Sequence, residues 1–211
     1  DQNFGQDQIL EVGKEFYNTS FDYQNRALIN FNGTSFTEMS QSIVNGDIPT
    51  DAKFVLKLYE SAGNSDLSSE YKIEGAAISE SWDEGVGKFG DNPKTTEGCS
   101  WENRLFPQGG NATTWSKSTG LPDHGVSTIS SNFGSQSFSY NSADINMDIT
   151  NMTRAWLDGT NKNNGILLRL SGSQETDEVT TANLKFFSRN THTIYAPRIE
   201  VQWDGHAIVT G

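Results

Sequence analysis

One cysteine and three histidines are the residues of this chain that could supply a nucleophile and its base. Cys99 is the only cysteine, and His124, His192 and His206 lie far apart along the sequence. A thiol nucleophile needs a neighbouring base, and a zinc site needs several ligands, usually at short spacing. Nothing except their presence connects these four residues. We therefore predict a packed or solvent-facing loop cysteine, no catalytic residue and no metal site.

Acidic residues offer a second chemistry, because glycoside hydrolysis uses two carboxyl groups about 5 to 9.5 Å apart. Asp83 and Glu84 are adjacent, but neighbouring acids arise by chance in a chain with 27 acidic residues. The segment Asp144–Asp148 resembles the start of a calcium loop, yet Ile149 stands where that loop needs glycine and Ala155 where it needs glutamate. We expect solvated acids, a β-strand at Asp144–Asp148 and no cofactor. A calcium site of another kind in the Asp- and Asn-rich loops stays open.

Three tryptophans are the candidates for contact with a ligand or a partner. Trp82, Trp101 and Trp115 lie in or beside glycine-rich loops, and an exposed aromatic ring can stack on the apolar face of a sugar. The alternative is a structural role in which the rings plug the ends of a sandwich. We favour the plug for Trp82 and Trp101, whereas the sequence favours neither role for Trp115.

The charge of the chain argues against two classes of partner. Fifteen Lys and Arg against 27 Asp and Glu give a formal net charge of -12, which repels a phosphate backbone. The same excess leaves no basic patch for a membrane surface, and no apolar run approaches the roughly 18 residues of a membrane span. We therefore expect no nucleic acid and no membrane among the partners.

Alternation of apolar and polar residues indicates the strands that position these side chains. Ala52–Tyr59 and Arg198–Trp203 alternate clearly, as does Arg26–Phe31. The apolar run Ile166–Leu170 is typical of a strand buried on both faces. Thr150 is expected to cap a short helix over about residues 151–158, with Gly159 as its C-terminal cap.

The tryptophans themselves fall around long connections. Tyr71–Trp82 is expected to be a strand, followed by an ordered loop through Gly85, Gly87 and Gly90 toward Trp101. Between Trp101 and Ser130 the sequence allows either a second long loop or two very short strands.

These elements predict an all-β fold. We expect a single domain over residues 1–211, built as a two-sheet antiparallel jelly-roll-like sandwich of roughly ten strands with one short helix and no long ones. Hydrophobic residues make up 34% and aromatic residues 11% of the chain, which is enough for one core despite the polar composition.

Eight stretches, in this order, resemble the family of DNRLRE-type domains, which is related to disaggregatase repeats and to a class of carbohydrate-binding modules. They are "NFGQDQILEVG" (Asn3–Gly13), "NRALINF" (Asn25–Phe31), "AKFVLKLYE" (Ala52–Glu60), "SWDEGVGKF" (Ser81–Phe89), "SWENR" (Ser100–Arg104), "MDITNMTRAWLDG" (Met147–Gly159), "NNGILLRL" (Asn163–Leu170) and "FFSRNTHTIYAPRIEVQWD" (Phe186–Asp204). The resemblance implies a β-jelly-roll of two antiparallel sheets without catalytic machinery. The family's opening strand would precede Asn3, where only Asp1 and Gln2 stand, so it is either lost or supplied by another chain. The start at Asp1, without Met or signal peptide, suggests processing.

Members of this family occur in secreted polysaccharide-acting enzymes and in tailed bacteriophages, and Ser81–Arg104 and Ser188–Asp204 are more similar to the phage form. The resemblance therefore implies a non-enzymatic virion structural protein, a decoration or fibre component of capsid, neck or tail, assembled in the host cytoplasm. Its expected partners are other virion proteins or copies of itself in an oligomer. The alternative is a carbohydrate-binding module of a secreted protein, whose loops around Trp82 to Trp115 bind a glycan.

Overall fold

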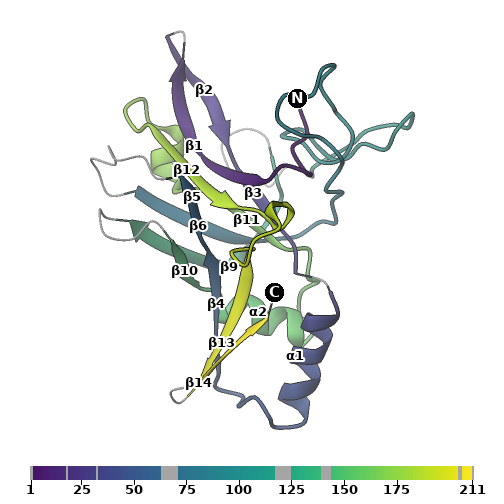
Figure 1. Ribbon diagram of the computed structural model, residues 1–211, viewed down its shortest axis with the longest axis vertical. Coiled ribbons are helices and arrows are strands. Elements are labelled where there is room, and N and C mark those ends of the chain that lie inside the picture. The colour runs from purple at the N-terminus through teal and green to yellow at the C-terminus, as the bar shows by residue number, and fades with distance from the viewer. Residues whose placement is uncertain are drawn as a thin grey trace.

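The protein is seen in a computed structural model that describes residues 2–17, 19–31, 33–62, 71–116, 125–138, 144–203 and 206–210. Antiparallel β-strands dominate the described residues, and only a few short helices accompany them (Figure 1). This confirms the all-β sandwich-like fold expected from the alternating sequence pattern.

Three four-stranded sheets form the body of the molecule. The first has the order β2-β1-β12-β5, with β1 Ile9–Tyr17, β2 Ser20–Asn25, β5 Glu60–Ala62 and β12 Ala182–Phe187. The second has the order β10-β4-β13-β14, with β4 Lys53–Leu58, β10 Ile145–Asp148, β13 Arg198–Trp203 and β14 His206–Thr210. The third has the order β3-β11-β6-β9, with β3 Ala27–Ile29, β6 Tyr71–Ile78, β9 Thr128–Phe138 and β11 Ile166–Leu170. A separate small ladder pairs β7 Asn103–Leu105 with β8 Thr113–Thr114.

Two bent segments connect these sheets into a sandwich. Only Tyr59 separates β4 from β5, and the Phe187 amide donates to the Tyr59 carbonyl at 3.0 Å, so the first and second sheets continue into each other. Only Arg26 separates β2 from β3, and this segment crosses from the first sheet to the third. The third sheet is therefore the layer that faces the first and second sheets.

The main core lies between the layers, as the period-two pattern requires. Ile166, Leu168 and Leu170 of β11 enter it together with Phe54 and Leu56 of β4. On the other face of the third sheet lies a smaller cluster of four buried residues: Ile78, Trp115, Val126 and Leu167. The whole of β11 is therefore buried, which confirms the prediction of a strand covered on both faces.

The helix expected over residues 151–158 is confirmed as α2, Thr150–Leu157, and Gly159 follows it at φ +77°. The prediction that Thr150 is the N-cap is wrong, since Ile149 occupies that position without a side-chain cap. The Thr150 hydroxyl instead accepts a hydrogen bond from the Phe54 amide at 3.0 Å, which ties the helix to β4.

Besides the one predicted helix, α2, the described residues form three helical elements that were not predicted. They are α1 Thr34–Val44, α3 Gly172–Thr176 and the 3-10 turn η1 Arg189–Thr191. The eleven residues of α1 were not expected, and this helix lies beside α2 (Figure 1). Met39 of α1 is buried, and Phe36 packs edge-on against Trp156 with ring centroids 6.3 Å apart.

The strand predicted over Tyr71–Trp82 ends at Ile78 as β6, so Trp82 lies in the loop. The loops beyond it follow the prediction in outline. Residues 79–102 form no helix or strand, and the segment beyond them contains the two very short strands β7 and β8. The loops gather beside the N-terminal residues, at the upper right of Figure 1.

None of the described helices is both long enough and apolar enough to cross a membrane.

Candidate functional site

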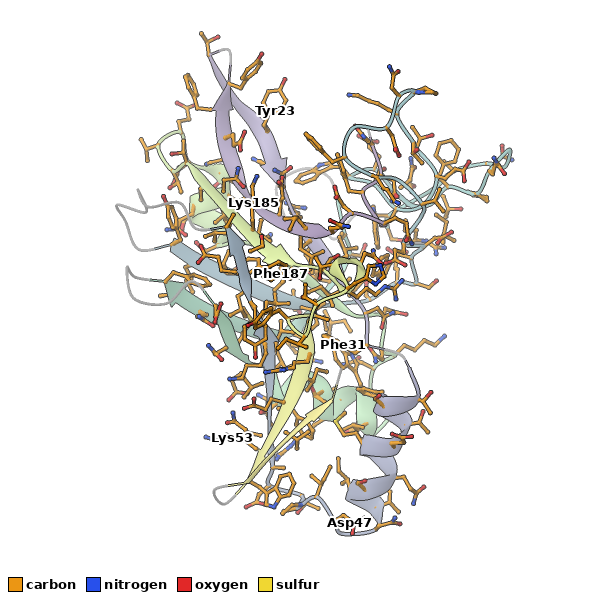
Figure 2. All side chains as sticks on the ribbon, in the orientation of Figure 1. Tyr23, Phe31, Asp47, Lys53, Lys185 and Phe187 are labelled. Atoms are coloured by element: carbon orange, nitrogen blue, oxygen red, sulfur yellow. The ribbon has the colours of Figure 1, made fainter. Side chains whose placement is uncertain are left out.

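A groove with a volume of about 1250 Å³ opens where the two layers separate, between the start of β1 and the edge of β3. We call it the β1–β3 groove. Its lining includes Leu10, Glu11, Leu28, Phe31, Trp82 and Lys185. Two of its lining residues are labelled in Figure 2: Phe31, which follows β3, and Lys185, which lies on β12.

Among the described residues, no strand pairs with the edge of β3 that faces away from β11. The Ile78 amide donates to the Gly165 carbonyl at 3.0 Å, so the odd-numbered residues of β11 bond to β6 and the even-numbered ones bond to β3. The register pairs Ile166 with Ile29, so Ile29 bonds to β11. The N–H and C=O of Leu28 therefore point to the open edge, without a partner among the described residues.

The start of β1 presents a second unpaired edge to the same groove. The Ser188 amide donates to the Gln8 carbonyl at 2.9 Å, so the even-numbered residues of β1 bond to β12, and Ile9 and Glu11 face the other way. Strand β2 pairs with β1 only from Gly13 onward. The departure of the β2–β3 segment toward the other layer thus leaves two strand edges open on one groove.

Two amide oxygens in the groove lining lack a hydrogen-bond donor. The Oδ1 atoms of Asn30 and Asn183 are buried and have no partner among the described residues, and both residues line the groove. A buried acceptor without a donor costs about 1 to 3 kcal/mol. A bound segment that carries N–H groups would remove that cost.

The rim of the groove is rich in acids. Asp7, Glu11, Glu15 and Glu84 line it, whereas Lys185 and Arg189 are the lining cations of the same rim. Glu11 pairs with Lys185 at 3.1 Å, and Glu84 pairs with Arg189. Burial raises the pKa of Glu84, and Asp83 raises it further, while Arg189 opposes both.

A buried ion network fixes the end of the groove at the crossover. Arg26 donates to both carboxylate oxygens of Glu175, at 2.7 and 2.9 Å, and its guanidinium lies 4.0 Å from the ring centroid of Trp101. Arg169 lies 3.7 Å from Glu175 on the same side. These side chains are almost fully buried, so a buried ion pair ties the bend between β2 and β3 to Glu175.

Asn3 fixes the N-terminal segment at the other end of the groove. Its Nδ2 donates to the carbonyls of Glu84 and Cys99, at 2.8 and 2.7 Å. Its Oδ1 accepts from the amides of Gly5 and Gly87, at 3.0 and 2.9 Å. A Cβ at Gly87 would lie 2.0 Å from the Asn3 carbonyl oxygen, which explains why glycine stands there.

The three tryptophans predicted as contact residues occupy different environments. Trp82 and Trp101 are half-buried and line the groove. Trp82 also packs on the outer cluster of the third sheet, and its Nε1 donates to the Asn164 carbonyl at 2.7 Å. Trp115 is only 3% exposed, and its Nε1 donates to the Ser100 carbonyl at 3.0 Å. Trp115 therefore offers no free ring face.

The thiol considered as a nucleophile is packed against the outer cluster. Burial raises the pKa of Cys99 to about 12, with a further contribution from the charges of Asp83 and Glu84. His192 is exposed, whereas His124 and the side chain of His206 lie outside the described residues. Within the described ranges no three His, Cys, Asp or Glu side chains come together as a metal site would require.

The acidic residues considered for catalysis or calcium binding have structural partners. Asp83 accepts a hydrogen bond from the Gly85 amide at 3.2 Å, and Glu84 is paired as described above. Residues Ile145–Asp148 form β10, as the alternation predicted. Asp144, just before it, accepts from the Glu60 amide at 2.9 Å.

Sequence reasoning missed the residues that define the groove, namely Leu10, Leu28 and the amides Asn30 and Asn183. The strand Arg26–Phe31 was predicted, but its pairing partners could not be read from alternation.

No protein-family model matches this chain, and a search of curated proteins found no significantly similar sequence.

Proposed function

We propose that this chain is a non-enzymatic structural subunit of a larger assembly, a virion as its resemblance to the phage form suggests, and that it contacts a neighbouring subunit through the β1–β3 groove. The observation that carries the proposal is the pair of unpaired strand edges, at Leu28 and at Ile9 and Glu11, on one groove. Unpaired edges are usually covered or blocked in monomeric proteins, because they invite pairing with other chains.

The groove has room for a polypeptide segment, since its volume of about 1250 Å³ is above the roughly 300 to 1,000 Å³ of small-molecule pockets. The raised pKa of Cys99 keeps its thiol protonated at neutral pH, which does not suit a nucleophile.

A photo-cross-linker in the groove tests the proposal in the host that naturally makes the protein. Benzoylphenylalanine replaces Ser35, which lines the groove, and in a matched control it replaces Val179, which is 83% exposed. We expect the Ser35 variant to cross-link to a structural protein of the particle and the Val179 variant not to. A chain that stays free of particles, or that cross-links equally from both positions, would contradict the proposal.

A glycan is the second candidate ligand, because Trp82 and Trp101 line the same groove. The guanidinium of Arg26 already covers one face of Trp101, which leaves less ring surface for a sugar. A glycan array separates the two functions. Specific binding that Trp101→Ala abolishes without lowering the unfolding temperature favours the module, and no binding by the wild type favours assembly.

A further inference from the structure

We infer that the occupant of the β1–β3 groove is an extended segment of a partner chain that carries Lys or Arg side chains and pairs with β3 at Leu28. It becomes the fifth strand of the third sheet. This inference rests on the proposed function and specifies the chemistry of its partner.

The backbone of β3 determines the conformation of the occupant. The N–H and C=O of Leu28 both point into the open edge, and a neighbouring extended backbone can satisfy this donor and acceptor together. Strand β3 is the terminal strand of its sheet over its whole length. The edge of β1, by contrast, is taken by β2 from Gly13 onward, so a strand added there would meet the β2–β3 crossover.

The polar groups of the groove determine the charge of the occupant. The unpartnered oxygens of Asn30 and Asn183 can only accept hydrogen bonds, so an occupant that pairs with them must carry hydrogen-bond donors. Four acids on the rim outnumber its two cations, and the third lining cation, Arg26, is already bound by Glu175. With a net charge of -12 on the whole chain, long-range attraction also favours a basic partner over a second acidic copy.

The apolar groups determine its side-chain pattern. Leu10 and Phe31 are half-buried, line the groove and pack against the main core. Side chains of a strand alternate between its faces. An apolar residue at every second position would therefore cover these side chains, and the residues between them would reach the acidic rim.

A tethered strand tests this inference without knowledge of the natural partner. Gln2 lines the groove, so a strand joined to the N-terminus by a Gly/Ser linker of about ten residues, with a span of roughly 18 Å, can reach β3. The test strand reads Lys-Val-Thr-Val-Thr-Val-Lys. One control replaces both Thr by Pro, which prevents continuous pairing, and another replaces both Lys by Glu.

The rate of hydrogen exchange at the Leu28 amide measures whether the tethered strand pairs with β3. Because a tether raises the local concentration to the millimolar range, we expect about tenfold slower exchange at Leu28 with the Lys strand than with the Pro control, and a smaller effect with the Glu strand. Unchanged exchange at Leu28, protection of Ile9 and Glu11 instead, or equal protection by the Lys and Glu strands would overturn the inference.

The two experiments fail separately. Cross-links from Ser35 to a particle protein without strand protection at Leu28 would leave the assembly function standing and remove the strand. Protection of Leu28 by the tethered strand without any particle contact would support the added strand and contradict the assembly function.

Discussion

Asn3 uses its whole amide group to join three segments of the chain. Two donated hydrogen bonds reach the carbonyls of Glu84 and Cys99, and two accepted ones come from Gly5 and Gly87. Because Asn3 is only 2% exposed, water cannot replace these bonds. The side chain therefore sets the position of the glycine-rich loop that borders the groove.

Asn3→Asp is predicted to destabilise the protein by about 2 to 4 kcal/mol, because it removes two donors and places a carboxylate beside two carbonyl oxygens. Urea unfolding measures the change. The exposed Gln8→Glu makes the same change of charge nearby and should alter stability by less than about 0.5 kcal/mol. Equal effects of the two substitutions would show that the Asn3 contacts contribute nothing.

Asp177 and Lys14 tie α3 to β1. The fully buried Nζ of Lys14 donates to the carbonyls of Gln174 and Asp177, at 2.7 and 2.6 Å, and lies 3.2 Å from Asp177 Oδ1. Burial alone would raise the pKa of Asp177. Hydrogen bonds from Thr180 and the Val179 amide, with Lys14, outweigh burial and hold that pKa well below its usual range.

The direction of this shift predicts acid sensitivity. A depressed carboxyl pKa contributes stability that is present above the unfolded-state pKa, about 3.9, and is lost as the pH falls through the folded-state pKa. Asp177→Asn should therefore lower the unfolding temperature at pH 7, and the gap to the wild type should narrow below about pH 4. The exposed Asp51→Asn serves as the control. A gap for Asp177→Asn that stays constant from pH 7 to pH 3 would contradict the assigned role.

Cys99 is predicted to react slowly with thiol reagents. A pKa of about 12 instead of 9 lowers the thiolate fraction about a thousandfold at pH 8. Because the nucleophilicity of a thiolate rises with its pKa, labelling of the native protein should be slower than that of glutathione by at least about thirtyfold, and unfolding in urea should remove the difference. Fast labelling of the folded protein would mean that the thiol is accessible and ionised.

At the scale of elements, α1 is predicted to be held by its packing rather than by its termini. It has no side-chain cap at its N-terminus and no basic residue in its last turn. Met39→Ala should cost about 2 to 5 kcal/mol, because the residue is 2% exposed in the core. Val44→Ala, at a position 77% exposed, should change the free energy of unfolding by less than about 0.5 kcal/mol. A loss below 1 kcal/mol for Met39→Ala would mean that α1 does not pack as described.

The elements that could be predicted are those whose burial follows a simple period. β13 was predicted with its bounds, because Ile199 and Val201 alternate with polar residues. Helix α1 was missed although Phe36, Met39 and Ile43 recur at helical spacing, because the sequence analysis assigned no element to this polar segment. Strand β9 was missed because only Asn132, Gly134 and Phe138 of its eleven residues are buried.

The candidate site could not be predicted from periodicity, because it depends on how segments far apart in sequence pair. Alternation at Arg26–Phe31 indicates a strand but says nothing of which edge stays open. The groove exists because β2 leaves β1 at Asn25 and continues as β3 in the other layer. The ion pair of Arg26 with Glu175, 149 residues later in the chain, secures that bend, and no local pattern signals such a contact.

At the scale of the whole molecule, two layers share one core except where the β1–β3 groove separates them. Away from the groove, strands β9 and β10 approach each other across the layers. A net charge of -12 acts over the whole surface and should make association with a basic partner faster at low salt. Among the described residues, the β1–β3 groove is thus an apolar, acid-rimmed opening bordered by two unpaired strand edges, which is where the proposed partner strand would pair.

Hydrogen exchange of the isolated protein tests the open edge most directly. In NMR measurements at native pH, we predict that the Leu28 amide exchanges at least about a hundredfold faster than the Ile29 amide, because only Ile29 donates within its sheet. Protection of Leu28 equal to that of Ile29 would mean that the edge of β3 is already paired, and the groove could not receive a strand there.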